Sequence, residues 1–374
     1  MSPRKRSAAR DGAAHTAYLV LGVHRSGTSA LTQLLALAGA DLPANLMPGD
    51  RHNEKGYFEP WKIALLNDER LWAAGSSWDD AFAFPYRPLP PAEERAWIQR
   101  AAALFVDEYG RAAWPLLKDP RVSVLLPAWK SVLAELGIGA RAVIQTRHPL
   151  AVAGSLKRRD GYPTERSLLL WCAYMLASEA YTRDMPRAFV EYESLLADWR
   201  GQVARIEAAH GAPLPALTEA AAREIDGFLT PDLRHNSGGG LEGLGWTGDL
   251  TARVMGWFDQ AAAGPEPDRG VLEEAAAELA RRREEVGLLV SPMGRDLDIA
   301  RTELREARRV MDAERAAAQS AYRRDREGLE RGWQADVRRL EALVEAREGE
   351  ASLLAAHARE ALEELESLLA DPDA

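Results

Sequence analysis

A polar turn near the start of the chain contains residue types that can hold a phosphate group. Gly22 and Gly27 bound this turn, and Arg25, Thr28 and Ser29 lie within it or directly after it. The glycines match the spacing of the nucleotide-binding pattern G-x-x-x-x-G-K-[ST], but Thr28 replaces the lysine that contacts the β- and γ-phosphates. Hydrolysis of a nucleoside triphosphate is therefore disfavoured. Because Arg25 can bring a cation to the same anion, the turn predicts a site for another kind of phosphate; an ordinary βα turn is the alternative.

Charged side chains also follow two later apolar runs. Lys118 comes directly after a short one, and Arg147 comes directly after residues 141–146. Ligands of open parallel sheets gather at the carboxyl ends of strands, so both residues are site candidates, although a plain surface turn would look similar. Ser155 lies about two turns into a helix expected to start near Pro149. Arg147 and Ser155 could therefore meet on one phosphate.

A third segment combines carboxylates, a histidine and aromatic residues. His52, Glu54, Tyr57, Phe58 and Glu59 follow one another closely, ahead of an expected helix. A carboxylate held against aromatic rings can have its pKa raised toward the value that a general base needs. The segment is therefore a candidate for proton transfer, and a solvated turn is the alternative.

These residues need a scaffold that brings the ends of several strands together. Short apolar runs predict strands, and apolar residues at helical spacing follow the first of them. The expected strands are residues 18–23, 114–117, 141–146 and 188–193. We predict an α/β fold, with a P-loop-type parallel β-sheet flanked by helices and followed by a C-terminal helical or coiled-coil segment.

Composition excludes several other classes of protein. A net charge of −10 makes nonspecific nucleic-acid binding a poor expectation. The single cysteine, Cys172, cannot form an internal disulfide and fits a reducing cytoplasm, where we expect the protein to be located. No stretch approaches the ~20 apolar residues that span a bilayer. We also expect no bound metal, because no cluster has the spacing of metal ligands.

The chain is predicted to have three parts: a disordered lead-in (1–14), a P-loop-like domain (15–290) and a long helix or coiled coil (291–374). From residue 296 to residue 369 proline is absent, and apolar residues recur near a 3.5-residue spacing. Glycines in this stretch leave a helical hairpin open. We expect residues 296–369 to form a homodimer or to dock on a partner enzyme of the same pathway; a solvated helix is the alternative.

The ordered set of motifs resembles the sulfotransferases that use 3′-phosphoadenosine 5′-phosphosulfate (PAPS), in particular the bacterial, carbohydrate and tyrosylprotein type. Residues 22–29 look like that family's 5′-phosphosulfate loop, and Arg147 with Ser155 matches its 3′-phosphate pair. Residues 118–120 (Lys-Asp-Pro) and 232–235 (Asp-Leu-Arg-His) resemble two further family segments. The resemblance extends over roughly residues 16–240 of the sequence.

The resemblance implies transfer of a sulfuryl group from PAPS to a hydroxyl acceptor, with a glycan favoured, by in-line displacement. Arg25 and the backbone from Ser26 to Ser29 would then stabilise the leaving phosphate. Lys118 matches the lysine that the family places near the transferred sulfuryl group. The family needs no metal for this reaction.

The general base has three candidates under this resemblance. Alignment with heparan-type sulfotransferases selects Glu54, whereas the Asn-x-x-Gly-x-x-Glu pattern of bacterial relatives selects Glu59. His52 is the third candidate, because cytosolic members use a histidine. A different class of function is also open: a non-catalytic nucleotide-binding or scaffolding protein that assembles through its coiled coil. A P-loop kinase is disfavoured by Thr28.

Overall fold

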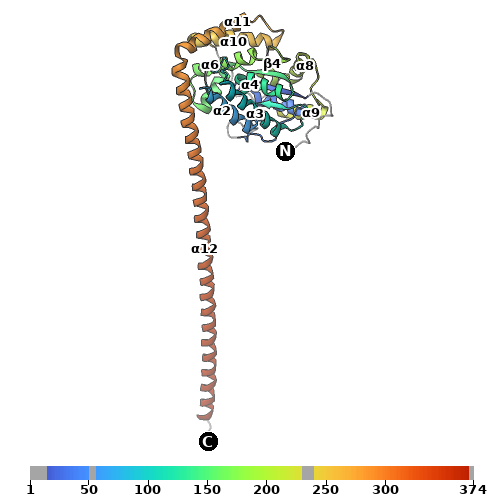
Figure 1. Cartoon of the computed structure of the whole chain (residues 1–374). Coiled ribbons are helices and arrows are strands. Elements are labelled where there is room, and N and C mark those ends of the chain that lie inside the picture. The colour runs from blue at the N-terminus through green and yellow to red at the C-terminus, as the bar shows by residue number, and fades with distance from the viewer. Residues whose placement is uncertain (1–14, 50–55, 230–239, 370–374) are drawn as a thin grey trace. The chain divides into compact units, whose positions relative to one another are not determined.

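The computed structural model describes residues 15–49, 56–229 and 240–369 of the chain. Within these residues lies a four-stranded sheet, in the order β2-β1-β3-β4, whose neighbouring strands are all parallel. The strands are β1 (Thr16–Leu21), β2 (Leu116–Lys118), β3 (Gly139–Thr146) and β4 (Arg187–Glu191). The predicted α/β fold with a parallel sheet is therefore confirmed, and Figure 1 shows the strands enclosed by helices.

The central strand β1 explains why both faces of the sheet must be covered. Its apolar residues are fully buried, but successive side chains point to opposite faces. Leu19 and Leu21 join one hydrophobic core, and Tyr18 and Val20 join the other. A strand that is apolar on both faces is typical of a parallel sheet between two layers of helices.

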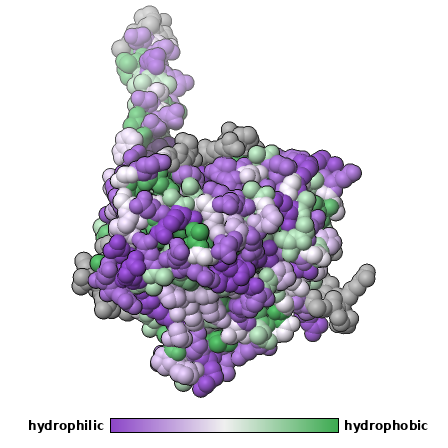
Figure 2. Space-filling model, turned by 90° about the horizontal axis from the view of Figure 1, so that it is seen from above, coloured by the Kyte–Doolittle hydropathy of each residue, from purple (hydrophilic) through white to green (hydrophobic). Residues whose placement is uncertain are grey.

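Each core has its own set of helices. One core receives side chains from α1 (Thr28–Leu37), α7 (Tyr192–Ala197), α8 (Trp199–His210) and α9 (Glu219–Phe228). The other receives them from α2 (Trp61–Ala73), α3 (Pro91–Tyr109), α4 (Val122–Glu135), α5 (Pro149–Asp160), α6 (Thr164–Ala180), α10 (Gly245–Ala263) and α11 (Gly270–Arg282). The outer face seen in Figure 2 is mostly hydrophilic, with small separate apolar patches.

At the carboxyl ends of two strands, the prediction extends two residues beyond the observed strand. The first strand was expected to reach residue 23 but ends at Leu21, because Gly22 takes a φ of 140° and turns the chain. The last strand was expected to reach residue 193, but α7 begins at Tyr192. The Glu191 carboxylate causes this change, since it accepts hydrogen bonds from the first N–H groups of α7 and caps the helix.

The C-terminal part consists of one helix, α12 (Leu288–Leu369), of 82 residues. The chain divides into two units between Asp298 and Ile299, so α12 supplies the described part of the second unit. No break occurs at the glycines of α12, and the predicted alternative of a helical hairpin is wrong. The helix itself was predicted, whereas coiled-coil pairing stays a prediction.

The domain ranges also stay predictions, and the predicted lead-in lies outside the described residues. Among the helices that the structure describes, none is long and apolar enough to cross a membrane.

Candidate active site

The loop between β1 and α1 depends on two glycines. Gly27 has a φ of 90°, which L-residues with side chains rarely adopt. A Cβ atom on Gly27 would lie 2.1 Å from the ring of Tyr192, and one on Gly22 would lie 2.5 Å from the carbonyl oxygen of Gln145. The Cβ-free backbone therefore lets the loop pack against the ends of β3 and β4.

Hydrogen bonds hold this loop in place at the N-terminus of α1. Ser26 Oγ donates to the carbonyl oxygen of Val23 at 2.7 Å. The Gly22 N–H donates to Ser123 Oγ at 2.9 Å. The free N–H groups and the positive end of a helix favour bound anions at such a position. The loop therefore has the backbone arrangement expected of a phosphate site, and phosphate binding stays a prediction.

Two predicted phosphate positions meet at the carboxyl end of the sheet. Arg25 Nε donates to Ser155 Oγ at 2.9 Å, although the residues are 130 positions apart. Arg147 Nη1 donates to the carbonyl oxygen of Arg25 at 3.2 Å. Because α5 begins with Pro149 directly after β3, it brings Ser155 next to the loop. Arg25, Arg147 and Ser155 thus form one cationic site.

The Arg147 guanidinium has unused hydrogen-bonding capacity. Its charged group lies 4.4 Å from the centre of the Tyr192 ring, and the residue is only 7% exposed. Arg147 Nε and Nη2 have no hydrogen-bond partner among the described residues. A buried donor without a partner is costly, so an anion at this position would satisfy both groups.

A buried ion pair lies at the end of the neighbouring strand β2. Lys118 Nζ donates to Glu59 Oε1 at 2.5 Å and to the carbonyl oxygen of Tyr57 at 2.9 Å. Both charged side chains are buried. Ser29 Oγ donates to the same Tyr57 carbonyl at 3.3 Å, which joins this pair to the phosphate loop. These contacts bring Glu59, Lys118 and the loop together. The sequence had indicated the three only as separate motifs.

The other residues of the Lys-Asp-Pro-Arg segment fix its position. Asp119 is fully buried and accepts hydrogen bonds from Asn67 Nδ2 at 2.7 Å and from Arg121 Nη1 at 3.0 Å. Arg121 Nε in turn donates to Asp68 at 2.6 Å. A satisfied buried network of this kind is rigid. Asp119 therefore holds the end of β2, while Lys118 faces the site.

His24 is a site residue that the sequence analysis missed. It is buried within the loop, with its ring 4.7 Å from that of Trp78 and 5.9 Å from that of Tyr174. Burial holds its pKa well below the usual value, and the surrounding cations have the same effect. These cations are Arg121, Arg159, Lys118 and Arg25. His24 is therefore neutral, and its Nε2 has no hydrogen-bond partner in the described part of the chain.

Tyr192 and Glu193 also belong to the site and were not predicted there. They follow β4 directly, and β4 pairs with β3, which Arg147 follows. The rule that charged residues at strand ends form sites would have found them. Extending the expected strand to residue 193 concealed this signal.

Several predicted site residues cannot be placed. Glu54 and His52 lie outside the described residues, as does the Asp-Leu-Arg-His segment at 232–235. The choice of general base therefore stays a prediction. Within the described ranges, no group of three or more His, Cys, Asp and Glu side chains is arranged to hold a metal ion.

Comparison with known proteins finds similar solved structures, among them two sulfotransferase domains. No protein-family model matches the chain, and no curated protein does. The sulfotransferase domain from the Synechococcus PCC 7002 olefin synthase is 19% identical, with a TM-score of 0.38, over 68% of this chain and 99% of that one. The sulfotransferase domain from the curacin biosynthetic pathway is 14% identical, with a TM-score of 0.34, over 72% of this chain and 99% of that one. Both the sequence identities and the TM-scores are low, so a function is inferred from the geometry of the site.

Proposed function

We propose that the protein is a PAPS-dependent sulfotransferase that acts on a hydroxyl acceptor. One observation supports this most directly: Arg25 of the phosphate loop is hydrogen-bonded to Ser155 and, through its carbonyl, to Arg147. Two phosphate positions next to each other, without the lysine of a triphosphate site, suit a nucleotide with separate 5′ and 3′ groups. The motif resemblance assigns the same residues to those groups.

The 5′-phosphosulfate would lie against the loop and the N-terminus of α1. The N–H groups from Ser26 to Ser29 and the Arg25 guanidinium would hold its phosphate. The 3′-phosphate would accept hydrogen bonds from Arg147 Nε and Nη2 and from Ser155 Oγ. This assignment gives a partner to each unsatisfied donor of Arg147.

The transfer step uses Glu59 and Lys118 in this proposal. The acceptor oxygen attacks sulfur as its proton passes to the Glu59 carboxylate. The bond from sulfur to the bridging oxygen breaks, and 3′-phosphoadenosine 5′-phosphate (PAP) leaves with the electron pair. Lys118, whose ammonium has three donors, keeps Glu59 in place and stabilises negative charge that develops on the transferred group. Positioning and electrostatics account for the rate acceleration.

We propose a glycan as acceptor, on the basis of the carbohydrate-type loop sequence alone. We also propose that α12 provides a surface for self-association. Leu329 and Trp333 are 76% and 70% exposed in the second unit, and burying such side chains against another helix is favourable. A non-catalytic nucleotide-binding protein is the competing proposal, which requires that PAPS binds without turnover.

Calorimetric titration with PAP, adenosine 5′-phosphate and ATP tests the nucleotide assignment. PAP should bind far more tightly than adenosine 5′-phosphate, and Arg147→Ala should remove roughly 2–3 kcal/mol of that preference, as for a charge-assisted contact. Arg200→Ala is the matched control, because Arg200 is exposed and paired with Asp226 on α9. Equal affinities for PAP and adenosine 5′-phosphate, or a preference for ATP, would contradict the proposal.

Catalysis is tested separately with labelled PAPS and a panel of hydroxyl acceptors. Turnover with any glycan supports the full proposal, and turnover with other hydroxyl compounds alone removes the glycan. Tight PAP binding without turnover of any acceptor would favour the non-catalytic alternative.

A further inference from the structure

A carboxyl group faces Arg147 at the proposed position of the 3′-phosphate. Glu193 follows Tyr192 in α7, and its Oε1 lies 3.7 Å from Arg147 Nε. This distance is too long for a hydrogen bond. Glu193 Oε2, like two nitrogens of Arg147, has no hydrogen-bond partner among the described residues. The carboxylate and the guanidinium therefore attract each other electrostatically, but no hydrogen bond forms between them.

A second carboxyl group lies beside Glu193. Glu191 accepts hydrogen bonds from the N–H groups of Glu193, at 3.1 Å, and Ser194, at 2.6 Å. Burial and the negative charge of the neighbouring Glu191 carboxylate raise the pKa of Glu193 to about 7. Arg147 opposes this change. Two interacting carboxyl groups titrate as a pair, and here Glu193 carries the proton.

Groups on other elements act on the same pair. Arg147, directly after β3, is the cation that faces Glu193. His148, which caps α5, and Asp259, in α10, interact electrostatically with Glu191 and with each other. Burial lowers the pKa of His148 and raises that of Asp259. A neutral His148 adds no positive charge, so Arg147 is the cation that ionised Glu193 and a bound phosphate would both contact.

We propose that Glu193 is a proton-linked counter-ion of Arg147. The Glu193 carboxyl must be neutral when the 3′-phosphate binds, so that PAP binding takes up a proton. This inference rests on the proposed function and adds a determinant of nucleotide binding to it. An ionised Glu193 beside a phosphate dianion would be repelled, since like charges in one site disfavour joint ionisation. A protonated Glu193 can instead donate a hydrogen bond to a phosphate oxygen.

The direction of the pH effect follows from this linkage. Below about pH 7, Glu193 of the free protein is already neutral, and PAP binding takes up little proton at this group. Above about pH 7 it is ionised, so binding requires protonation and PAP affinity falls by up to about tenfold per pH unit. The 3′-phosphate itself gains a second proton below pH ~6 and becomes less negative. Its attraction to Arg147 is therefore weaker below that pH. PAP affinity should therefore be greatest near neutral pH.

The test is titration of the full chain with PAP at pH 6.5, 7.5 and 8.5, each in two buffers of different ionisation enthalpy. For the wild type we expect proton uptake at the two higher pH values and about tenfold weaker binding at pH 8.5 than at pH 7.5. Glu193→Gln should bind PAP without uptake, show no such loss and bind more tightly than wild type at pH 8.5. Glu193→Ala should also abolish the uptake.

Two controls separate this inference from the proposed function. Glu135→Gln, at the exposed end of α4, should behave as wild type. Adenosine 5′-phosphate should bind without proton uptake, because it lacks the 3′-phosphate. If PAP is preferred but uptake is the same in wild type and Glu193→Gln, the role of Glu193 is wrong and the function stands. If PAP is not preferred over adenosine 5′-phosphate, both proposals fail.

Discussion

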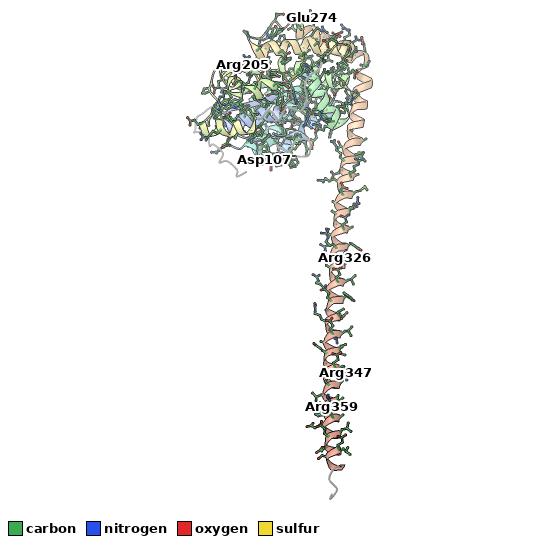
Figure 3. All side chains as sticks on the ribbon, turned by 180° about the vertical axis from the view of Figure 1, so that it is seen from behind. Asp107, Arg205, Glu274, Arg326, Arg347 and Arg359 are labelled. Atoms are coloured by element: carbon green, nitrogen blue, oxygen red, sulfur yellow. The ribbon has the colours of Figure 1, made fainter. Side chains whose placement is uncertain are left out.

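Charged residues are stabilised in opposite ways in the two units of this chain. In the first unit, Lys118 pairs with Glu59 across 59 positions of sequence, and both side chains are buried. In α12, Arg326 pairs with Glu330 at 3.2 Å, four positions away, and both side chains are exposed. Figure 3 shows side chains such as Arg326 and Arg347 extending outward along α12.

The difference indicates what each unit depends on. Exposed pairs one helical turn apart contribute little to stability, because water and salt screen them. A buried pair that loses one partner leaves an uncompensated charge, which is strongly destabilising. The site is therefore sensitive to single substitutions, whereas α12 depends on the pattern of many residues.

The largest effect is expected from the proposed base. Glu59→Gln should lower turnover of labelled PAPS by roughly 10²–10⁴-fold, the range for a general base, while PAP affinity stays nearly unchanged. Glu330→Gln on α12 is the matched control and should keep full turnover. Glu54→Gln is measured in parallel. Full activity of both Glu59→Gln and Glu54→Gln would leave His52 as the candidate base.

The buried pair should also affect stability. Lys118→Met leaves Glu59 buried without its partner and should reduce the free energy of unfolding by about 3–5 kcal/mol. Arg326→Met removes the exposed pair and should cause no measurable change. Urea unfolding followed by tryptophan fluorescence measures both. Adding Glu59→Gln to Lys118→Met should recover part of the stability, and no recovery would show that the loss has a different cause.

The smallest effect on the site is expected from removing the second unit. Cutting the chain after Asp298 should leave PAP affinity within about twofold, because the proposed contacts all lie before this position. Light scattering should show a monomer for the cut chain and a dimer for the full one. A monomeric full chain would contradict self-association through α12. Loss of PAP binding on truncation would show that the second unit contributes to the nucleotide site.

Local sequence was sufficient for the elements that depend on near neighbours. The sequence alone predicted the strand that contains Tyr18, the helix after Gly27, the start of α5 near Pro149 and the long helix over the proline-free stretch 296–369. Their causes act within a few residues: apolar periodicity, the freedom of glycine and the fixed φ of proline. The predicted strand over 188–193 was too long because one capping carboxylate, Glu191, begins a helix within it.

Only the tertiary structure decided which of the candidate residues meet. Strand order places the ends of β1, β2 and β3 side by side, so that Arg25 reaches Ser155. The same arrangement pairs Lys118 with Glu59 and separates the buried Asp119 from the site. It also brings Glu193, just after the end of β4, to Arg147, just after the end of β3. Such pairings depend on how distant segments pack, because spacing along the chain carries no information about distance between elements.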